Sequence, residues 1–455
     1  MPHITLRTLS KRTLKTNPLL AHRDKAKHTK NAKGDLQTKY FVISECYNSK
    51  HSDLLTSRLR YHLKSYNLTE YMKIRDLDIK RFKFNLNDLA KAKDCAKQMI
   101  LTKKTKFPPY IMDQQFDFIW RNAINEVKDK RFYGIRANLI NMLNESRISI
   151  IDNKSDIYTH MHSYCPDIAI KHLAHTFYIH EKSNFNFTDD TKHSTDQNAI
   201  VNSIATSKST HSQSQSSIQH YILRPVDSFS GKDIFYISTK QELNKAIEYY
   251  NTHKNYKGVT YGNNVIASEY IINPFLFKGL KFHMRVYYLI SYINNKFASF
   301  MLEFGKIIHA GKPYTTKKPF TKIVHDTHMD NSNDSFWPED FTPELKAHYP
   351  AILSQIKTIL KCVSNIITNR DFKQSWLYPE QKNGFTLLGV DVMVDASGRV
   401  YLIEINNKAG FICKKLENNK KLEHILFDWI NETILKPYYT KNLQLAQQHK
   451  TYIEL

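Results

Sequence analysis

The segment 389–406 limits the possible folds of this chain more than any other part of it. It consists of two runs in which apolar and polar residues alternate, separated by Ser397-Gly398, a pair typical of two-residue β-hairpin turns. With this pair as the loop, Asp391 lies directly opposite Glu404, and Asn406 lies one step along on the same face. Two carboxylates at cross-strand distance repel one another unless a cation lies between them. The segment therefore predicts a hairpin that gathers oxygen ligands on one face.

The ligand types on this hairpin indicate which cation it would hold. Asp391, Glu404 and Asn406 offer oxygen alone, without His or Cys, which favours a hard ion such as Mg²⁺ or Mn²⁺ held partly by phosphates. The alternative is that both acids form salt bridges with lysines, in another strand register. We prefer the metal site because the pairing falls on an otherwise apolar face.

A second strand pattern, at 279–290, places three basic side chains on one face. Lys281, His283 and Arg285 alternate there with apolar residues. Such a face suits nucleotide phosphates and ribose, with Arg as the natural ligand of a terminal phosphate. A solvated strand face is the alternative interpretation.

A third pattern, at 223–234, reads as a strand, a turn of small residues that includes Ser230 and Gly231, and a second strand. Backbone N–H groups in a turn of this kind can bind phosphate. The signal is weak on its own, because many hairpins carry Ser and Gly.

The composition excludes several classes of protein. The 455 residues are 41% hydrophobic and 12% aromatic, which lies within the globular range. No apolar run approaches the ~18–20 residues that cross a bilayer. The net charge of +23 favours a polyanionic partner, namely nucleic acid, anionic lipid or an acidic protein segment, although an AT-rich genome would also encode many lysines. The five Cys are scattered and form no metal-ligand pattern, so we expect reduced, buried thiols in a cytosolic protein.

The order of the patterns predicts an α+β protein. Hairpin signals favour antiparallel sheets over a doubly wound parallel sheet. Strands are predicted at 39–44, 221–224, 234–237, 264–271, 282–293, 297–302, 386–395 and 399–406. Helices are predicted at 53–65, 87–102, 117–127, 240–252, 343–368 and 420–435. Residues 1–35 carry nine Lys and Arg but two Asp, and a disordered basic arm is preferred there over a mitochondrial presequence.

Taken in order, these segments resemble the tubulin–tyrosine-ligase-like family of ATP-grasp ligases. The family's Gly-x-Asp and Leu-Ile-Glu-x-Asn signatures match in full within 389–406, and its Gly-x-Lys-Phe-Asp-x-Arg strand matches 279–285 except at His283. Weaker matches are Asp152-Asn153-Lys154, His175-Thr176-Phe177, Arg224-Pro225 through Ile234, and Ser268 to Pro274. The similarity covers roughly 135–435.

The resemblance implies a fold, a reaction and partners. The implied fold is an ATP-grasp fold, in which two α+β lobes with antiparallel sheets clasp ATP behind a small α/β N-terminal domain. ATP would phosphorylate a carboxylate, and the amine of free Glu, Tyr or Gly would displace the phosphate. The implied acceptor is the acidic tail of tubulin or of a similar protein in the cytoplasm, with possible association with the cytoskeleton. No membrane partner is expected, and nucleic acid is a fallback.

The expected domain limits follow from the same comparison. They are a basic, disordered arm at 1–38, an N-terminal domain at 39–150, a central lobe at 151–270 with a disordered insertion at 188–219, a C-terminal lobe at 271–440 and a tail at 441–455. Since the chain ends soon after the core, no large C-terminal microtubule-binding domain is expected.

The resemblance also assigns residue roles. It implies that Asp391, Glu404 and Asn406 hold Mg²⁺ or Mn²⁺, with two ions, and that Arg285 and Lys281 act in catalysis. The implied nucleotide contacts are Lys154, Arg224, Ser230, Gly231, Ser268, Glu269, Tyr270, Ile271, Lys281 and His283.

Several positions depart from the family pattern. Arg224 replaces a Lys, Ser268 a Gln and His283 an Asp, while Asp233 replaces the second loop Gly and would add negative charge near the phosphates. These departures motivate an alternative function, a catalytically weak ATP-grasp module whose basic surface binds a polyanion or an acidic tail.

The position that normally reads the substrate departs as well. The family's Arg falls on Ile308, and Lys306 or His309 would have to replace it. The amino acid added, the acceptor carboxyl group, and the choice between starting and extending a chain are therefore left open.

Overall fold

The computed structural model describes thirteen stretches of the chain. They are residues 39–44, 57–70, 115–121, 136–181, 220–226, 233–254, 259–317, 320–327, 335–379, 381–407, 409–410, 416–442 and 452–454. The basic arm, the insertion at 188–219, the helix predicted at 87–102, and Ser230 and Gly231 all lie outside these stretches.

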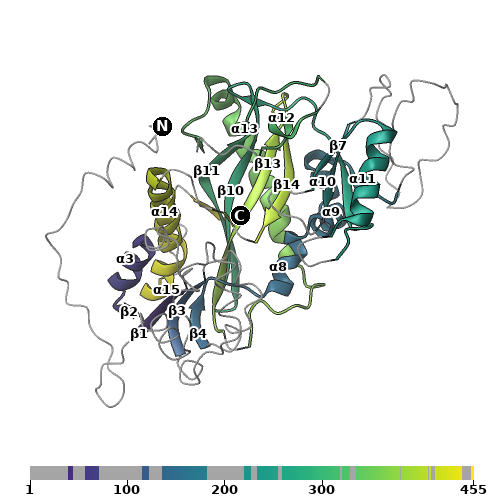
Figure 1. The fold of residues 1–455 in the computed structure, drawn as a ribbon. Helices are drawn as coiled ribbons and strands as arrows, with labels where there is room; N and C mark the ends of the chain where they lie inside the picture. Colours follow the sequence, from purple (N-terminus) through teal and green to yellow (C-terminus); the bar gives the residue numbers. More distant parts are fainter. Residues whose placement is uncertain are drawn as a thin grey trace, which may run out of the picture.

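The larger of two sheets joins strands from both ends of the described chain (Figure 1). Its hydrogen-bonded path is β12–β11–β10–β13–β4–β3–β1–β2, with β14 paired to β13, β9 to β10 and β15 to β11. The antiparallel part contains β9 (Leu276–Phe277), β10 (Leu280–Ile293), β11 (Lys296–His309), β12 (Ser335–Trp337), β13 (Gly384–Val394), β14 (Val400–Asn406) and β15 (Tyr452–Glu454). The parallel part contains β1 (Lys39–Ser44), β2 (Leu68–Glu70), β3 (Gln115–Arg121) and β4 (Arg136–Ile140).

The smaller sheet is antiparallel and has four strands. Their spatial order is β5 (Thr176–Tyr178), β8 (Val265–Glu269), β6 (Tyr221–Pro225) and β7 (Phe235–Ile237). Helix α11 (Lys240–Thr252) packs Leu243, Ala246 and Tyr250 into the same core cluster as β6 and β8. A capping box fixes its start, because Thr239 accepts a hydrogen bond from the Glu242 N–H and the Glu242 carboxylate accepts one from the Thr239 N–H.

Helices cover the antiparallel sheet on both faces. One face packs against α13 (Pro343–Thr368), which contributes Ile352, Ile356 and Ile359 to the core with Met284 and Val286 of β10. The opposite face packs against α14 (Leu416–Ile430), α3 (Ser57–Ser65) and the π-helix η4 (Asn431–Leu435). The other described helices are α8 (Glu145–Asp152), α9 (Lys154–Tyr164), α10 (Pro166–His172), α12 (Lys322–His325) and α15 (Lys436–Thr440). No helix in the described stretches is long and apolar enough to span a membrane.

The two faces of β10 explain how one strand serves both core and site. Met284 and Val286 point into the α13 side, while Tyr287 and Leu289 pack on the α14 side. The basic residues of β10 lie on this second face, ahead of Tyr287, and are buried there. The strand therefore changes from a polar to an apolar lining along one face.

The sequence predicted the long strands of the two sheets, missed the shorter strands β2, β4, β5, β9, β12 and β15, and assigned one strand to a helix. The strands predicted between 221 and 406 and the helices at 240–252 and 343–368 are confirmed. The helix predicted at 117–127 is wrong, because Gln115–Arg121 is strand β3. Phe118 and Trp120 recur at every second position and are buried against Phe385 of β13, which is the period of a strand.

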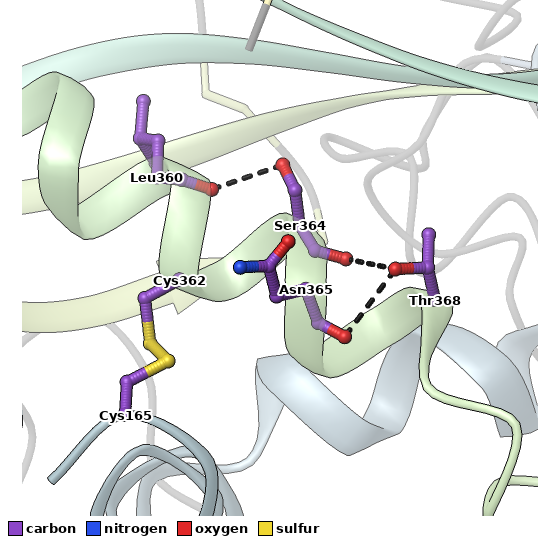
Figure 2. Close-up of a disulfide and its surroundings, with 6 residues drawn as sticks. All are labelled: Cys165, Leu360, Cys362, Ser364, Asn365 and Thr368. Atoms are coloured by element: carbon purple, nitrogen blue, oxygen red, sulfur yellow. Dashed lines mark hydrogen bonds between the residues drawn. A yellow bond between two sulfur atoms is a disulfide. The ribbon is translucent and has the colours of Figure 1, made fainter.

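The expectation that the cysteines stay reduced is wrong for one pair. Cys165 and Cys362 form a disulfide across a sequence separation of 197 residues, with their Cα atoms 6.2 Å apart (Figure 2). Cys165 lies at the junction of α9 and α10, and Cys362 lies in the C-terminal third of α13. No local spacing signals this pair, because it depends on how α10 and α13 pack. Cys46, Cys95 and Cys413 lie outside the described residues.

We expect Cys362→Ser to lower stability, since a bridge between distant residues restricts the unfolded chain. The loss should be about 2–5 kcal/mol, seen as a lower urea midpoint in oxidising buffer. Cys165→Ser should lower stability equally, because either change removes the same bridge. Two results together would contradict the bridge. They are equal urea midpoints for wild type and Cys362→Ser, and reaction of both Cys165 and Cys362 of the wild type with thiol-labelling reagents.

Candidate functional site

One cavity between the two sheets collects most of the predicted site residues. The predicted residues that line it are Lys154, Arg224, Ser268, Glu269, Tyr270, Ile271, Lys281, His283, Asp391 and Glu404. Arg285 and Asn406 join this set through hydrogen bonds to Asp391. The structure thus brings together the predicted residues that it describes.

The β13–β14 hairpin has the predicted register at the site and a different turn. Asp391 pairs with Glu404 as expected. Nearer the turn, however, Val392 pairs with Leu402, because Ile403 is an extra residue that forms a β-bulge. Asp395 closes the turn by accepting a hydrogen bond from the Gly398 N–H and donating one to the Arg399 carbonyl, so the loop has three residues rather than two. The extra residue of the bulge compensates for the extra residue of the loop. Asp391 therefore still lies opposite Glu404.

Asp391 is held by a buried arginine. Arg285 donates two hydrogen bonds to its carboxylate, Nε to Oδ1 at 2.5 Å and Nη2 to Oδ2 at 2.8 Å. Burial alone would lower the pKa of Arg285, but the charge of Asp391 and the hydrogen bonds to it outweigh burial and raise that pKa above its ordinary value. A third bond, from Nη1 to the Ala409 carbonyl at 2.6 Å, fixes the plane of the guanidinium.

Glu404 is held by the corner between α8 and α9. Lys154, the first residue of α9, places Nζ 3.3 Å from Glu404 Oε2, and Asn406 Nδ2 donates to Glu404 Oε1 at 3.0 Å. Asp152 accepts a hydrogen bond from the Asn407 N–H at 3.0 Å and ties the same corner to the end of β14. Asn153 caps α9 between them, so the Asp-Asn-Lys segment anchors the hairpin as well as supplying a cation.

Arg224 projects from β6 of the smaller sheet toward the hairpin. Its Nη2 donates to Ser268 Oγ at 3.2 Å, and Nη1 lies 3.5 Å from the Ile403 carbonyl. Burial lowers the pKa of Arg224, and the charge of Glu404 partly opposes that shift. Ser268 therefore takes part in orienting the guanidinium.

Lys281 lies at an aromatic end of the cavity. Its Nζ donates to the Tyr270 hydroxyl at 2.8 Å and lies 4.0 Å from the centre of that ring. Burial lowers the pKa of Lys281 to about 7, partly opposed by the charge of Asp326. Tyr270 also bonds His325 Nδ1 at 2.7 Å. Burial, followed by the charge of Lys281, lowers the pKa of His325 to about 4.

His283 stands between Asp391 and a loop that the sequence did not place at the site. Its Nδ1 lies 2.6 Å from Thr327 Oγ1, and its Nε2 lies 3.7 Å from Asp391 Oδ1. The structure also lines the cavity with His325, Asp326 and Thr327. Tyr236, Met393 and Leu402 also line it, and only Met393 and Leu402 had a signal, as alternating residues of the hairpin.

The expectation that Asp233 adds negative charge near the phosphates finds no support in its contacts. Its carboxylate accepts hydrogen bonds from Tyr249, at 2.6 Å, and from Tyr261. Burial would raise the pKa of Asp233, but these hydrogen bonds outweigh it and lower the pKa. The backbone has a φ of +58°, which explains why Gly is usual at this position, and Asp is among the residues that tolerate it.

The structure separates the two residues proposed to replace the substrate-reading arginine. Lys306 pairs with Arg285 across β10 and β11, so both side chains lie on the face of the site. His309 pairs with Phe282, is 7% exposed and contacts the ring of Phe277, which places it on the core face. Lys306 therefore remains as the candidate.

The donor set on the hairpin fits a hard divalent cation. Two carboxylates and an amide converge there, and Mg²⁺ often takes one or two carboxylates together with substrate phosphates. Among the described residues, no group of three or more His, Cys, Asp and Glu forms a complete protein-only metal site. Phosphate oxygens would have to complete the coordination.

We expect the free energy of unfolding of wild type, minus that of Lys281→Met, to increase with pH. The folded protein releases the Lys281 proton near pH 7 and the unfolded chain near 10.5, so the wild type gains stability between these values. The gain should approach about 1.4 kcal/mol per pH unit and be absent below pH 7. Urea midpoints from pH 6 to 9 test this, with Lys357→Met, which alters a surface ion pair, as the control. A constant difference would contradict it.

Comparisons with known proteins agree with this geometry. The model of the tubulin-tyrosine ligase family matches residues 151–442. Tubulin polyglutamylase TTLL13 of Mus musculus is 25% identical over 235 residues, covering 46% of this chain and 27% of that protein. A probable tubulin–tyrosine ligase of Schizosaccharomyces pombe is 23% identical over 246 residues, covering 49% and 59%. A probable α-tubulin polyglutamylase of Tetrahymena thermophila is 23% identical over 215 residues, covering 45% and 52%.

A solved structure shows the fold. The C-terminal domain of K. lactis Pby1, an ATP-grasp enzyme that interacts with the mRNA decapping enzyme Dcp2, superposes with a TM-score of 0.52 at 16% identity, over 91% of this chain and 98% of that one. The predicted α+β ATP-grasp fold is thereby confirmed. The chain spans less than two thirds of the length of each curated relative it matches. The match over 151–442, which contains every described residue of the site, shows that the chain belongs to the tubulin-tyrosine ligase family.

Proposed function

We propose that the chain is an ATP-dependent carboxylate–amine ligase that adds Glu, Tyr or Gly to the acidic C-terminal tail of tubulin or a similar protein. One observation carries this proposal. The Asp391, Glu404 and Asn406 set lies beside Lys154 and Arg285, at a cavity between two sheets. Membership of the family supports it further.

The proposed chemistry has two balanced steps. An acceptor carboxylate oxygen bonds to the terminal phosphorus of ATP as ADP leaves. The amine of the amino acid then bonds to the acyl carbon, phosphate leaves with the C–O bond pair, and the amine loses a proton. ATP supplies the phosphoryl group, and we propose that two Mg²⁺ or Mn²⁺ ions bind together with it.

The chain's own residues bind and orient in this scheme. Arg224, Lys154 and Arg285 provide positive charge for the phosphates from three separate elements. Residues Glu269 to Ile271 and the Lys281 side chain line the same cavity, and the nucleobase is proposed to lie beside them. Asp391, Glu404 and Asn406 are the proposed metal ligands.

The partner and location are part of the same proposal. A net charge of +23 would speed the approach of an acidic tail and would do so less at high salt. We place the protein in the cytoplasm, associated with the cytoskeleton. Disulfides are rare in the cytoplasm. Cell fractionation tests the proposed location, and thiol trapping of Cys165 and Cys362 in the same fraction tests whether the disulfide forms there.

The alternative proposal is a catalytically weak module that binds an acidic tail or another polyanion. Two observations favour it, namely a histidine at position 283 beside Asp391 and an isoleucine at 308 opposite it on β11. Both reduce the number of charged groups available for catalysis and substrate reading.

We expect purified protein with Mg-ATP, tubulin and labelled Tyr, Glu or Gly to incorporate label into the tail. Asp391→Asn or Glu404→Gln should lower incorporation by about 100-fold or more, because each removes a ligand for the phosphate-bound cation, while tail binding stays nearly intact. Glu303→Gln is the matched control, since Glu303 pairs with Lys357 on the surface and should not matter.

Two results would overturn the ligase proposal. One is the absence of incorporation by wild type with any of the 20 amino acids or any acidic acceptor. The other is unchanged incorporation by Asp391→Asn. Thermal shift separates the alternative, because a module with a dead site should gain no stability from Mg-ATP.

For the choice of amino acid, we propose Lys306 as the cation that reads the incoming carboxylate. Lys306→Gln should raise KM for the amino acid about tenfold and leave KM for ATP nearly unchanged, because a lost ion pair affects one substrate. His309→Asn serves as the comparison and should not raise that KM. An equal effect on both KM values would rule out this role.

A further inference from the structure

The ion pair of Arg285 and Asp391 occupies the atoms that a cation would need. Both carboxylate oxygens of Asp391 accept hydrogen bonds from the one guanidinium, and the residue is 1% exposed. Bidentate pairs of this kind are among the strongest charge-assisted contacts in proteins. Asp391 is therefore already neutralised by a residue of its own chain.

The protein is built around this guanidinium. A Cβ on Gly389 would lie 2.9 Å from Arg285 Cδ, and a Cβ on Gly410 would lie 2.7 Å from Arg285 Nη1. Side chains at either position would push the arginine out of line with Asp391. The carbonyl of Ala409, the residue before Gly410, accepts the third hydrogen bond of the guanidinium.

The partner of Glu404 is held far less firmly. Lys154 Nζ lies 3.3 Å from Glu404 Oε2, and both side chains are partly exposed, at 12% and 20%. An ammonium on a flexible stem is displaced more easily than a buried planar fork with two bonds. Of the two acids, Asp391 is the more firmly paired.

We propose that the Arg285 guanidinium and a divalent cation compete for the carboxylate of Asp391, so that the cation binds tightly only together with the nucleotide. The inference rests on the proposed ATP-dependent function and adds an order to it. Terminal phosphate oxygens offer a guanidinium the same two-point, charge-assisted geometry as a carboxylate. The nucleotide thus gives Arg285 a second anion at the moment when Asp391 is needed for the cation, and each charge keeps a partner throughout.

A competing arrangement sets the terms of the test. Each carboxylate oxygen has a second lone pair, so a cation could bind Asp391 while Arg285 stays in place. In that case removing the positive charge of Arg285 would strengthen cation binding through simple electrostatics, and removing any other nearby positive charge would do the same.

The test measures binding of Mn²⁺ alone, without nucleotide, by calorimetry and by the electron spin resonance of free Mn²⁺. Arg285→Gln should bind Mn²⁺ at least about tenfold more tightly than wild type, because it leaves a buried carboxylate without a counter-charge. Arg285→Lys keeps the charge but loses the fork, and it should gain about threefold. Lys154→Gln removes an equal charge beside Glu404 and should gain less than Arg285→Gln.

Further variants show where the ion binds and guard against a misfolded protein. Adding Asp391→Asn to Arg285→Gln should abolish the gain. If Arg285→Gln melts well below wild type, Arg285→Lys decides the question alone, because its charge is retained. Competition is wrong if Arg285→Lys binds Mn²⁺ like wild type, or if Arg285→Gln and Lys154→Gln gain equally.

A parallel measurement separates this inference from the proposed function. Wild type should gain thermal stability with Mg²⁺ and a non-hydrolysable ATP analogue. No gain overturns the nucleotide site itself, whereas a gain combined with equal Mn²⁺ affinities for wild type and Arg285→Lys overturns only the competition.

Discussion

Two carboxylates side by side on one hairpin impose the main constraint on this structure. Asp391 and Glu404 face each other across β13 and β14, and their repulsion has to be offset by cations from elsewhere in the chain. Arg285 arrives from β10 and Lys154 from α9, while Asn406 donates to both acids. The larger sheet, the corner between α8 and α9, and the hairpin are consequently fixed relative to one another by charge as well as by packing.

The local patterns identified most of this arrangement because the site is built from strands with regular alternation. The 389–406 segment predicted the carboxylate pair even though its turn was misjudged, since the bulge at Ile403 restored the register. The three basic residues of β10 were assigned to one face by period alone. The departures from the family pattern were visible in the sequence, but which face of β11 holds Lys306 became clear only from its pairing with Arg285.

What the sequence could not supply was any contact that depends on packing between distant segments. The bridge between Cys165 and Cys362 requires α10 to pack on α13. Asp233 accepts hydrogen bonds from Tyr249 on α11 and from Tyr261 in the loop before β8. Tyr236 lies on a predicted strand that no motif linked to the site, and Thr327 lies in a loop, yet both reach the cavity. The failed helix at 117–127 has a similar origin, because burial of Phe118 and Trp120 in the sheet outweighs weak helical periodicity.

Gly389 and Gly410 contribute to this chemistry through the atoms they lack. A Cβ at Gly410 would meet the guanidinium of Arg285, and a Cβ at Gly389 would meet its Cδ and the Ala409 carbonyl that the guanidinium bonds. A glycine, which has no functional group, therefore helps to fix the position of the Arg285 charge. Replacing the glycine would displace the Arg285 side chain without changing residue 285 itself. A substitution at either glycine would therefore disturb the ion pair of Arg285 and Asp391 without changing a charged residue.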